Sequence, residues 1–516
     1  MKTSVRILAN TSAAYARLIV VSCAALFTIP IAIHVLGASD YGVFSVIAGC
    51  LTFLLFINEA LMSGAQRHIA YALGQGDTEE AMNWLDASIA VHLALAAAIA
   101  LIAICLGNIV IYHFLKIPPA RLQTAMWIYR MVIVAIGCNI LSAPFQGLLL
   151  AYESIVPLSV VNMCSAVSLL AGTVILWKLP GDKLLWYGGI YVCSQTMLYL
   201  GPIVYCIARY SECRRFKLVA ARARVKELLS FSVWNLFGAF ASVARAQGPA
   251  VLLNRFLGPV ANASYGMALQ INSFSLNIGS GLSRATSSPI IKRSGANDKV
   301  GMEELSNLTS TMSFGLLWIG MAPLMFETHY LLGLWVHRIP ANTSGFVVIL
   351  LITTMMEELG TGLKITVQAV GKIAFYQTAV GLTHMLVIPF MYVALRMGFS
   401  PVIALSTVLV SSAFAGILRA WLTASLAKIS IRRWIRRVIL PGCLCAAAGG
   451  IIYFPLNHWM SPGLVRCGVF AFVNACVGAS IVWGYGLTQR NRNTVKELYW
   501  QALKRITPRE SGTAAL

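Results

Sequence analysis

The sequence has little charge: 11% of its 516 residues are Asp, Glu, Lys or Arg. Soluble domains average about a quarter charged residues, so this chain lacks the polar side chains needed to cover a water-facing surface. It also lacks a GxxxxGK[ST] phosphate-binding loop, an HExxH or GxSxG motif and a Cys/His cluster. These absences argue against an enzyme, against ATP hydrolysis on this chain, and against a metal or other cofactor.

Acidic residues are scarce as well, with 18 Asp and Glu against 39 Lys and Arg and a net charge of +21. In a soluble protein this balance would suggest nucleic acid as a partner. Here the basic residues gather in alternate connections between apolar runs, which is the distribution of the positive-inside rule. We therefore expect no nucleic-acid partner, and we expect both termini in the cytoplasm.

Long apolar runs are what the sequence has in abundance, since 58% of its residues are hydrophobic. A helix needs roughly 20 apolar residues to cross the hydrocarbon core of a bilayer. The sequence predicts an all-α integral membrane protein with about 14 transmembrane helices. The predicted spans are 12–35, 40–66, 84–112, 123–150, 155–177, 184–208, 228–256, 262–288, 307–333, 345–367, 374–396, 400–425, 438–457 and 464–487.

An internal repeat divides these spans into two lobes. His34-Val-Leu-Gly37 before Tyr41-Gly42 resembles Arg255-Phe-Leu-Gly258 before Tyr265-Gly266. Six helices separate the copies, so the repeat is parallel, with a pseudo-two-fold axis along the membrane normal. The alternative is chance similarity among apolar helices. The predicted parts are an N-terminal lobe (1–208), a C-terminal lobe (228–425), two additional transmembrane helices (426–488) and a cytoplasmic tail (489–516).

The segment 209–227, between the two lobes, is a basic amphipathic linker. We expect it to lie along the inner membrane surface, where its cations meet anionic lipids.

Charged residues deep in the predicted spans are candidates for function, because a charge at the bilayer centre costs at least roughly 2.5–3.5 kcal/mol. Arg245 is the deepest; it faces a cavity between the lobes or pairs structurally with an acid. Glu59 is either a coupling-ion residue or a structural hydrogen-bond partner. Of the adjacent Glu357 and Glu358, about 100° apart on a helix, one is expected to line the cavity. Arg17 lies near a helix end, where snorkelling is an equal explanation.

Two polar stripes with a spacing of seven residues suggest the walls of a shared polar cavity. A spacing of seven keeps residues on one helix face with about 20° of drift per step. The alternative is a buried helix–helix interface held by amide groups. The stripes are Gln270, Asn277 and Arg284 in one span and Thr52, Glu59 and Gln66 in another. Because Arg guanidinium groups match phosphate oxygens, a cationic cavity favours an anionic head group.

Five segments resemble bacterial polysaccharide flippases of the multidrug/oligosaccharidyl-lipid/polysaccharide exporter superfamily. They are residues 36–45 (LGASDYGVFS), 67–77 (RHIAYALGQGD), 143–153 (APFQGLLLAYE), 234–238 (WNLFG) and 257–263 (LGPVANA). The resemblance implies a two-lobed, V-shaped bundle of 14 helices in the bacterial inner membrane. It also implies a flippase for undecaprenyl-diphosphate-linked oligosaccharide repeat units, acting in O-antigen, capsule or exopolysaccharide assembly.

On this reading the substrate-binding candidates are Arg245, Arg284, Asn277, Gln270, Arg17 and Gln66, and the ion-coupling candidates are Glu59, Glu357 and Glu358. The expected partners are the lipid-linked oligosaccharide, anionic membrane lipids, and a polysaccharide polymerase with chain-length proteins. A peptidoglycan lipid II flippase and a cation-coupled multidrug exporter remain open. The exporters usually carry an acid in their first helix, and residues 12–35 contain none.

Overall fold

The computed structural model describes residues 3–52, 55–114, 117–210, 213, 221–335, 339–489 and 492, and these residues form helices and connections without a strand. The predicted all-α class is confirmed. The helices are α1 (Thr3–Thr52), α2 (Leu55–Gln75), α3 (Thr78–Ile109), α4 (Leu122–Ala151), α5 (Ile155–Ile175), α6 (Lys183–Arg209), α7 (Arg222–Leu257), α8 (Pro259–Gly295), α9 (Lys299–Phe326), α10 (Thr328–Trp335), α11 (Thr343–Leu359), α12 (Thr361–Val370), α13 (Ile373–Met385), α14 (Val387–Arg396), α15 (Pro401–Ala427), α16 (Ile431–Trp434), α17 (Leu440–Trp459) and α18 (Leu464–Ile481).

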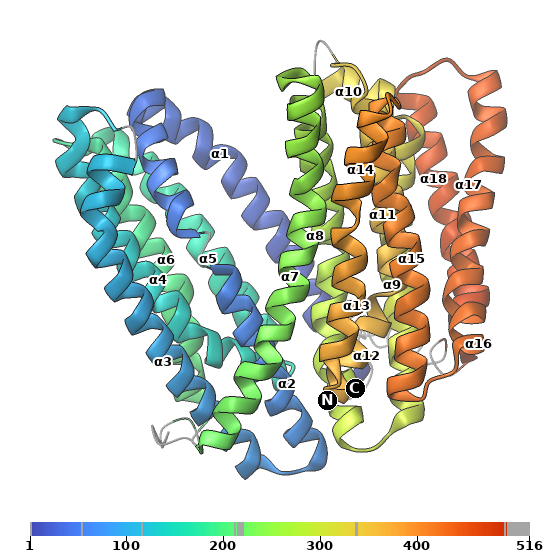
Figure 1. Ribbon diagram of the computed structural model, residues 1–516, viewed down its shortest axis with the longest axis horizontal. Helices are drawn as coiled ribbons and strands as arrows, with labels where there is room; N and C mark the ends of the chain where they lie inside the picture. Colours follow the sequence, from blue (N-terminus) through green and yellow to red (C-terminus); the bar gives the residue numbers. More distant parts are fainter. Residues whose placement is uncertain are drawn as a thin grey trace, which may run out of the picture.

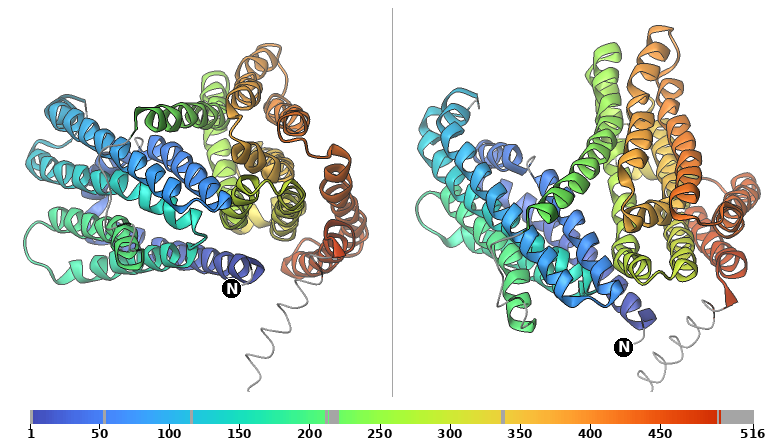
Figure 2. Two further views of the ribbon diagram at one scale, coloured as in Figure 1. Left: turned by 90° about the horizontal axis from the view of Figure 1, so that it is seen from below. Right: turned by 60° about the horizontal axis from the view of Figure 1, so that its bottom comes forward.

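The molecule is V-shaped, with two arms that diverge from one end (Figures 1 and 2). Helices α1–α6 form one arm, here called the N-lobe, and α7–α15 form the other, the C-lobe. The arms meet at the end near the N-terminus, which we call the closed end, and separate at the opposite, open end. Helices α17 and α18 pack against α9 on the outer side of the C-lobe.

The helices agree with the predicted spans with a few differences in detail. Eleven helices among the described residues are long and apolar enough to cross a membrane, and the bent pair α11 and α12 makes up to twelve. That pair bends by 44° at Gly360, within the predicted span 345–367. The predicted span 262–288 lies on α8, which is long enough but carries many polar residues. The span 40–66 is divided between the end of α1 and α2, and residues 53–54 lie outside the described residues.

The linker predicted at 209–227 falls only partly within the described chain. Residues 211–212 and 214–220 lie outside it, and α7 begins at Arg222.

The predicted parallel repeat is supported by backbone conformation. Positive φ angles recur at pairs of positions 217 to 221 residues apart, and such angles are uncommon for residues other than Gly. Each pair marks the same connection in the two lobes. The pairs are Gly37 and Gly258 (both 81°), Gly76 (83°) and Asn297 (60°), Glu153 (60°) and Gly371 (84°), and Gly181 (83°) and Gly398 (81°).

The N-caps of α3 and α9 repeat as well. The Asp77 side chain accepts a hydrogen bond from the Glu80 amide, and the Asp298 side chain accepts one from the Gly301 amide. An Asp at this position satisfies an otherwise unpaired donor of the first helical turn. The two lobes therefore begin corresponding helices with the same Asp cap, although most other residues of these helices differ between the lobes.

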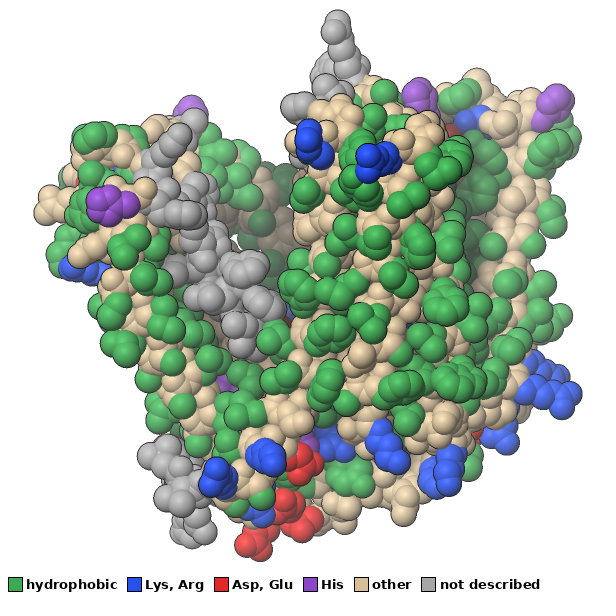
Figure 3. Space-filling view, in the orientation of Figure 1, with side chains coloured by type: hydrophobic (Ala, Val, Ile, Leu, Met, Phe, Trp, Pro, Cys, Tyr) green, Lys and Arg blue, Asp and Glu red, His purple; other side chains and the backbone are tan. Residues whose placement is uncertain are grey.

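Large apolar side chains cover the outer surface of both lobes. Leu26, Ile451 and Phe454 are 70%, 72% and 80% exposed. Figure 3 shows hydrophobic side chains around the middle of the molecule and most of the visible Lys and Arg near the closed end. Such a surface is stable in a bilayer, where exposed apolar groups meet lipid rather than water.

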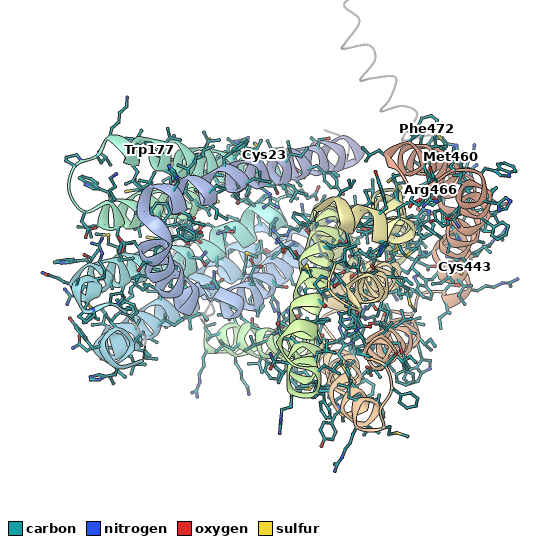
Figure 4. The ribbon with its side chains drawn as sticks, turned by 90° about the horizontal axis from the view of Figure 1, so that it is seen from above. Cys23, Trp177, Cys443, Met460, Arg466 and Phe472 are labelled. Atoms are coloured by element: carbon teal, nitrogen blue, oxygen red, sulfur yellow. The ribbon has the colours of Figure 1, made fainter. Side chains whose placement is uncertain are left out.

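A buried ion pair joins α18, one of the two helices that follow the C-lobe in the sequence, to the end of α9. Arg466 of α18 donates to Glu327, which caps α9, with a shortest N–O distance of 2.5 Å, and both side chains are less than 5% exposed. Trp318 of α9 also donates to Asn474 of α18 at 3.0 Å. Figure 4, viewed from the open end, shows Arg466 and Phe472 on these helices at the edge of the C-lobe.

Candidate functional site

Two chambers lie between the lobes. The first, of about 290 Å³, is bounded by α2 of the N-lobe and by α7, α12, α13 and α15 of the C-lobe. The second, of about 380 Å³, is bounded by α2 and α4 on one side and by α8, α11 and α12 on the other. Lys364 and Gln368 of α12 line both chambers. The two chambers therefore meet at α12, and we call them together the central cavity.

Lys364 is the central cation of this cavity. Its side chain lies deep inside the protein but is exposed to the space of the two chambers. It has no hydrogen-bond or ion-pair partner among the described residues. Glu357 and Glu358 interact with it electrostatically but not by a direct contact, so its three donors remain available to an anionic ligand. The sequence analysis did not single out Lys364, because it lies near the end of the predicted span 345–367.

Arg245, the deepest predicted cation, is paired with an acid. Its Nη2 lies 3.0 Å from Oε1 of Glu357, and its Nη1 donates to Ser412 at 3.1 Å. Ser412 in turn donates to Glu357 at 3.0 Å. Arg245 and Glu357 are 15% and 19% exposed. In this structure Arg245 thus forms an ion pair with an acid, and neither residue is in the lining of the two chambers.

The neighbouring acid points elsewhere. Glu358 lines the second chamber, accepts a hydrogen bond from Thr361 at 2.9 Å, and packs against α8 at Gly279, where an added Cβ would lie 2.7 Å from Oε1. Glu357 and Glu358 thus face different sides of α11, as expected from their angular separation.

A third cation, Arg419, lines the first chamber with His384. Arg419 Nη2 donates to His384 Nε2 at 3.1 Å, so this ring nitrogen acts as an acceptor. His384 is 3% exposed, and its Nδ1 has no partner among the described residues. His384 was also missed in the sequence, because a single His in an apolar span gives no signal of its partner 35 residues away.

The remaining predicted cations flank the contact between the lobes. Arg284 of α8 is exposed and lines the second chamber, and Arg17 of α1 lies close enough for their like charges to repel. Neither has a hydrogen-bond or ion-pair partner within the described part of the chain. Both are therefore available to an anionic ligand.

The predicted polar stripes are brought together only in part. Gln66 lines the second chamber and donates to Ser288 across the lobes at 2.9 Å. Glu59 is exposed, lines the first chamber and has no partner among the described residues. Gln270 is exposed but lines neither chamber. The side chain of Asn277 lies outside the described residues.

The central cavity is closed at the end near the N-terminus. There α2 and α8 cross at Gly74 and Gly295, which the repeat relates. An added Cβ on Gly74 would lie 2.7 Å from Cα of Lys292, and one on Gly295 would lie 3.2 Å from Cα of Gly74. Lys292 also pairs with Glu153 of the other lobe at 2.9 Å. The V therefore opens only at the other end, as Figure 1 shows.

The donor set of the cavity suits an anion rather than a metal ion. Among the described residues no group of three His, Cys, Asp or Glu could hold a metal. The cavity instead presents Lys364, Arg284 and Arg419 together with amides such as Gln368. Guanidinium and ammonium groups in a largely apolar setting bind phosphate or carboxylate oxygens.

Both the sequence and the fold of the chain were compared with those of known proteins. A family described as polysaccharide biosynthesis protein matches residues 7–294, more than half of the chain. No curated protein sequence matches the chain.

Solved structures with the same fold are transporters. A MATE protein in the straight conformation aligns with a TM-score of 0.69 at 13% identity, over 83% of this chain and 98% of that one. The outward-facing conformation of a multidrug resistance MATE family transporter of the MOP superfamily gives 0.67 at 13%, over 83% and 97%. A MOP superfamily transporter from Pyrococcus furiosus gives 0.64 at 13%, over 84% and 96%. At these identities the likeness establishes the fold alone, which consists of two lobes of helices.

Proposed function

The chain belongs to the polysaccharide biosynthesis protein family, and from that membership we propose that it is a flippase. Its substrate would be an undecaprenyl-diphosphate-linked oligosaccharide, moved across the bacterial inner membrane by alternating access. Family and fold are those of a multi-pass membrane transporter. We further propose that the membrane is the bacterial inner membrane and that the closed end faces the cytoplasm.

The observation that carries the proposal is the set of unpaired cations between the lobes. Lys364 and Arg284 line the chambers, Arg17 lies beside Arg284, and none of the three forms a hydrogen bond or ion pair with another described residue. A diphosphate with two or more negative charges would neutralise them and gain charge-assisted hydrogen bonds. The amides of Gln66, Gln368 and other cavity residues would contact the sugar hydroxyls. The prenyl chain would stay in lipid beside the gap between the arms.

Movement would follow from the arrangement of the lobes. In this structure the arms meet at α2 and α8 and diverge at the other end. Rocking of the lobes about the fixed cavity would part α2 from α8 and bring the open ends together. Glu59, which is exposed in the first chamber without a partner, is better placed to bind a coupling proton or sodium ion than Glu357, which Arg245 already neutralises.

The test is the pool of polyprenyl-linked intermediates in cells that lack this protein. The proposal expects undecaprenyl-diphosphate oligosaccharide to accumulate on the cytoplasmic face and surface polymer to be lost, with rescue by the wild-type chain. Normal polymer with altered sensitivity to cationic drugs would instead indicate a multidrug exporter. Accumulation of peptidoglycan lipid II would indicate the related flippase of that pathway.

The cavity residues are tested in the same cells. Lys364→Gln and Arg284→Gln each remove one cation, and loss of a charge-assisted hydrogen bond of about 1.5–3 kcal/mol lowers substrate affinity roughly 10- to 100-fold. Surface polymer should fall while expression and thermal stability stay at the wild-type level. Arg432→Gln, which removes an exposed cation from α16, is the matched control. Full export by both cavity variants would contradict the cationic-cavity argument.

A further inference from the structure

A third cavity, of about 790 Å³, lies at the closed end and is separate in its lining from the central cavity. It is formed by α2, the first turns of α7, the junction of α12 and α13, and the end of α15. We call it the basic vestibule and define it by Arg67, Lys226, Trp234, Gly371, Lys372 and Phe375. Nothing in the proposed transport cycle uses these residues.

The floor of the vestibule is built around Arg67. The guanidinium lies over the rings of Tyr71 and Phe231, with 5.1 and 5.7 Å to the ring centroids. Its Nη1 donates to Nδ1 of His68 at 3.0 Å, whereas its Nε is buried and has no partner among the described residues. The two aromatic rings and His68 together hold the guanidinium in place at the floor of the vestibule.

Gly371 makes room for that guanidinium. Its φ of 84° favours glycine, and an added Cβ would overlap Arg67 Nη2, with Cζ 2.9 Å away. Helix α13 begins directly afterwards, at Ile373, without a side-chain cap. The first turn of a helix carries unpaired amide groups and a partial positive charge, which adds to the positive potential of the vestibule.

The rim of the vestibule is also cationic. Lys226 and Lys372 are exposed and have no ion-pair partner among the described residues. The only acid in the lining is Glu227, whose carboxylate is 60% exposed and lies 3.7 Å from His68. Three cations therefore face one acid, and the site carries a net positive charge.

The other lobe shows that the fold does not need this charge. The repeat places Glu153 where the C-lobe has Gly371. A cavity of about 340 Å³ lies beside Glu153 and has no Lys or Arg in its lining. Asn10 fills part of it, donating to the Glu153 carbonyl at 2.7 Å and accepting from Ile155. Only the C-lobe member of the pair has become a basic site, which indicates a ligand rather than a packing requirement.

The depth of the vestibule identifies the ligand class. Helix α7 has 36 residues, so it is about 54 Å long, whereas the hydrocarbon core of a bilayer is about 30 Å thick. Its first turns, with Lys226, therefore reach the layer of lipid head groups. Trp234 and the 63% exposed Phe375 lie on the same lining and offer an apolar wall. We propose that the basic vestibule binds the phosphate group of an anionic membrane lipid, with Arg67, Lys226 and Lys372 around the phosphate and the aromatic side chains against its acyl chains.

The experiment measures lipid binding to the full-length chain purified in detergent, by native mass spectrometry with dioleoylphosphatidylglycerol, dioleoylphosphatidylcholine or glycerol phosphate. The test variant is Lys226→Gln with Lys372→Gln, because both side chains are exposed and their loss spares the fold. The control is Arg432→Gln with Arg436→Gln, which removes the same charge from exposed positions at the same end. Melting temperatures without lipid verify that both variants are folded.

We expect saturable binding of phosphatidylglycerol that is about tenfold weaker in the vestibule variant and unchanged in the control variant. Phosphatidylcholine and glycerol phosphate should bind much more weakly. Equally weakened binding of phosphatidylglycerol in the two variants would show a general charge effect and would overturn the proposal. Unchanged binding in both variants would also overturn it. Equally tight, variant-sensitive binding of glycerol phosphate would overturn the assignment to a lipid. None of these outcomes depends on whether the chain transports a lipid-linked sugar.

Discussion

Adding one methyl group at the crossing of α2 and α8 should shift the protein away from the conformation seen here. In Gly74→Ala the new Cβ would lie 2.7 Å from Cα and 2.8 Å from the carbonyl carbon of Lys292. These are backbone atoms of a long helix, so no change of rotamer relieves the contact. The same argument applies to Gly295, whose Cβ would approach the backbone of Tyr71 and Gly74.

The size of the effect follows from the geometry. Ordinary van der Waals contact begins near 3.4 Å and the new Cβ would lie 2.7 Å from Cα of Lys292, so the two helix ends must separate by at least about 0.7 Å. Overpacking of this kind costs about 1–3 kcal/mol. The cost applies only while the two ends touch, so it acts as a difference between the two conformations. The population of molecules closed at the crossing of α2 and α8, relative to those open there, should therefore fall roughly 5- to 150-fold.

The assay is a distance distribution between spin labels on non-natural amino acids at Lys183 and Met397, one on each arm near the open end. Gly74→Ala should increase the population with the shorter distance. Gly266→Ala on α8, where an added Cβ meets nothing within 4 Å, is the control and should leave the distribution unchanged. An unchanged distance distribution in Gly74→Ala, at an unchanged melting temperature, would refute the reasoning. It would show that the two helices accommodate the methyl group without a free-energy cost.

Two ion pairs, one buried and one partly buried, give further predictions. Glu327→Gln leaves Arg466 buried without its counter-charge, which should lower stability by about 3–5 kcal/mol, measured as the melting temperature in detergent. The double variant Glu327→Leu with Arg466→Met should recover most of this loss, and equal loss in both would contradict the charge argument. Glu357→Gln strands Arg245 in the same way and should lower both stability and surface polymer, whereas Arg245→Lys should retain part of each.

The fold was largely predictable because its determinants are local. Apolar length predicts a membrane helix, and a Gly or Asp at a fixed offset predicts the same turn in both lobes. The repeat found at Gly37 and Gly258 is confirmed in the backbone and extends to Glu153 and Gly371. The helix count was harder, because α8 carries polar residues that lower its apolarity below that of a typical span. The bend at Gly360 was not predicted, since the segment has no proline and its apolar length fits a single span.

The cavity was less predictable because it depends on contacts between distant segments. The sequence showed that Arg245 lies deep in a helix but not that Glu357, 112 residues away, reaches it. Periodicity placed Gln66 and Arg284 on polar faces, and both line the second chamber. It gave no reason to single out Lys364, which lies just after the bend between α11 and α12. The helical period identifies which face is polar, and only the packing of the other lobe decides what that face meets.

The two lobes share a backbone pattern but not their buried chemistry, and the difference bears on mechanism. Asn139, at the position that the repeat relates to Glu357, accepts a neutral hydrogen bond from Asn58 at 2.6 Å, whereas Glu357 accepts from Arg245. A neutral amide pair is insensitive to the charges around it, while a buried ion pair depends strongly on the local dielectric. The C-lobe ion pair should therefore respond when rocking changes the water content of the adjacent cavity. The amide pair at the related position in the N-lobe should be much less affected by the same change.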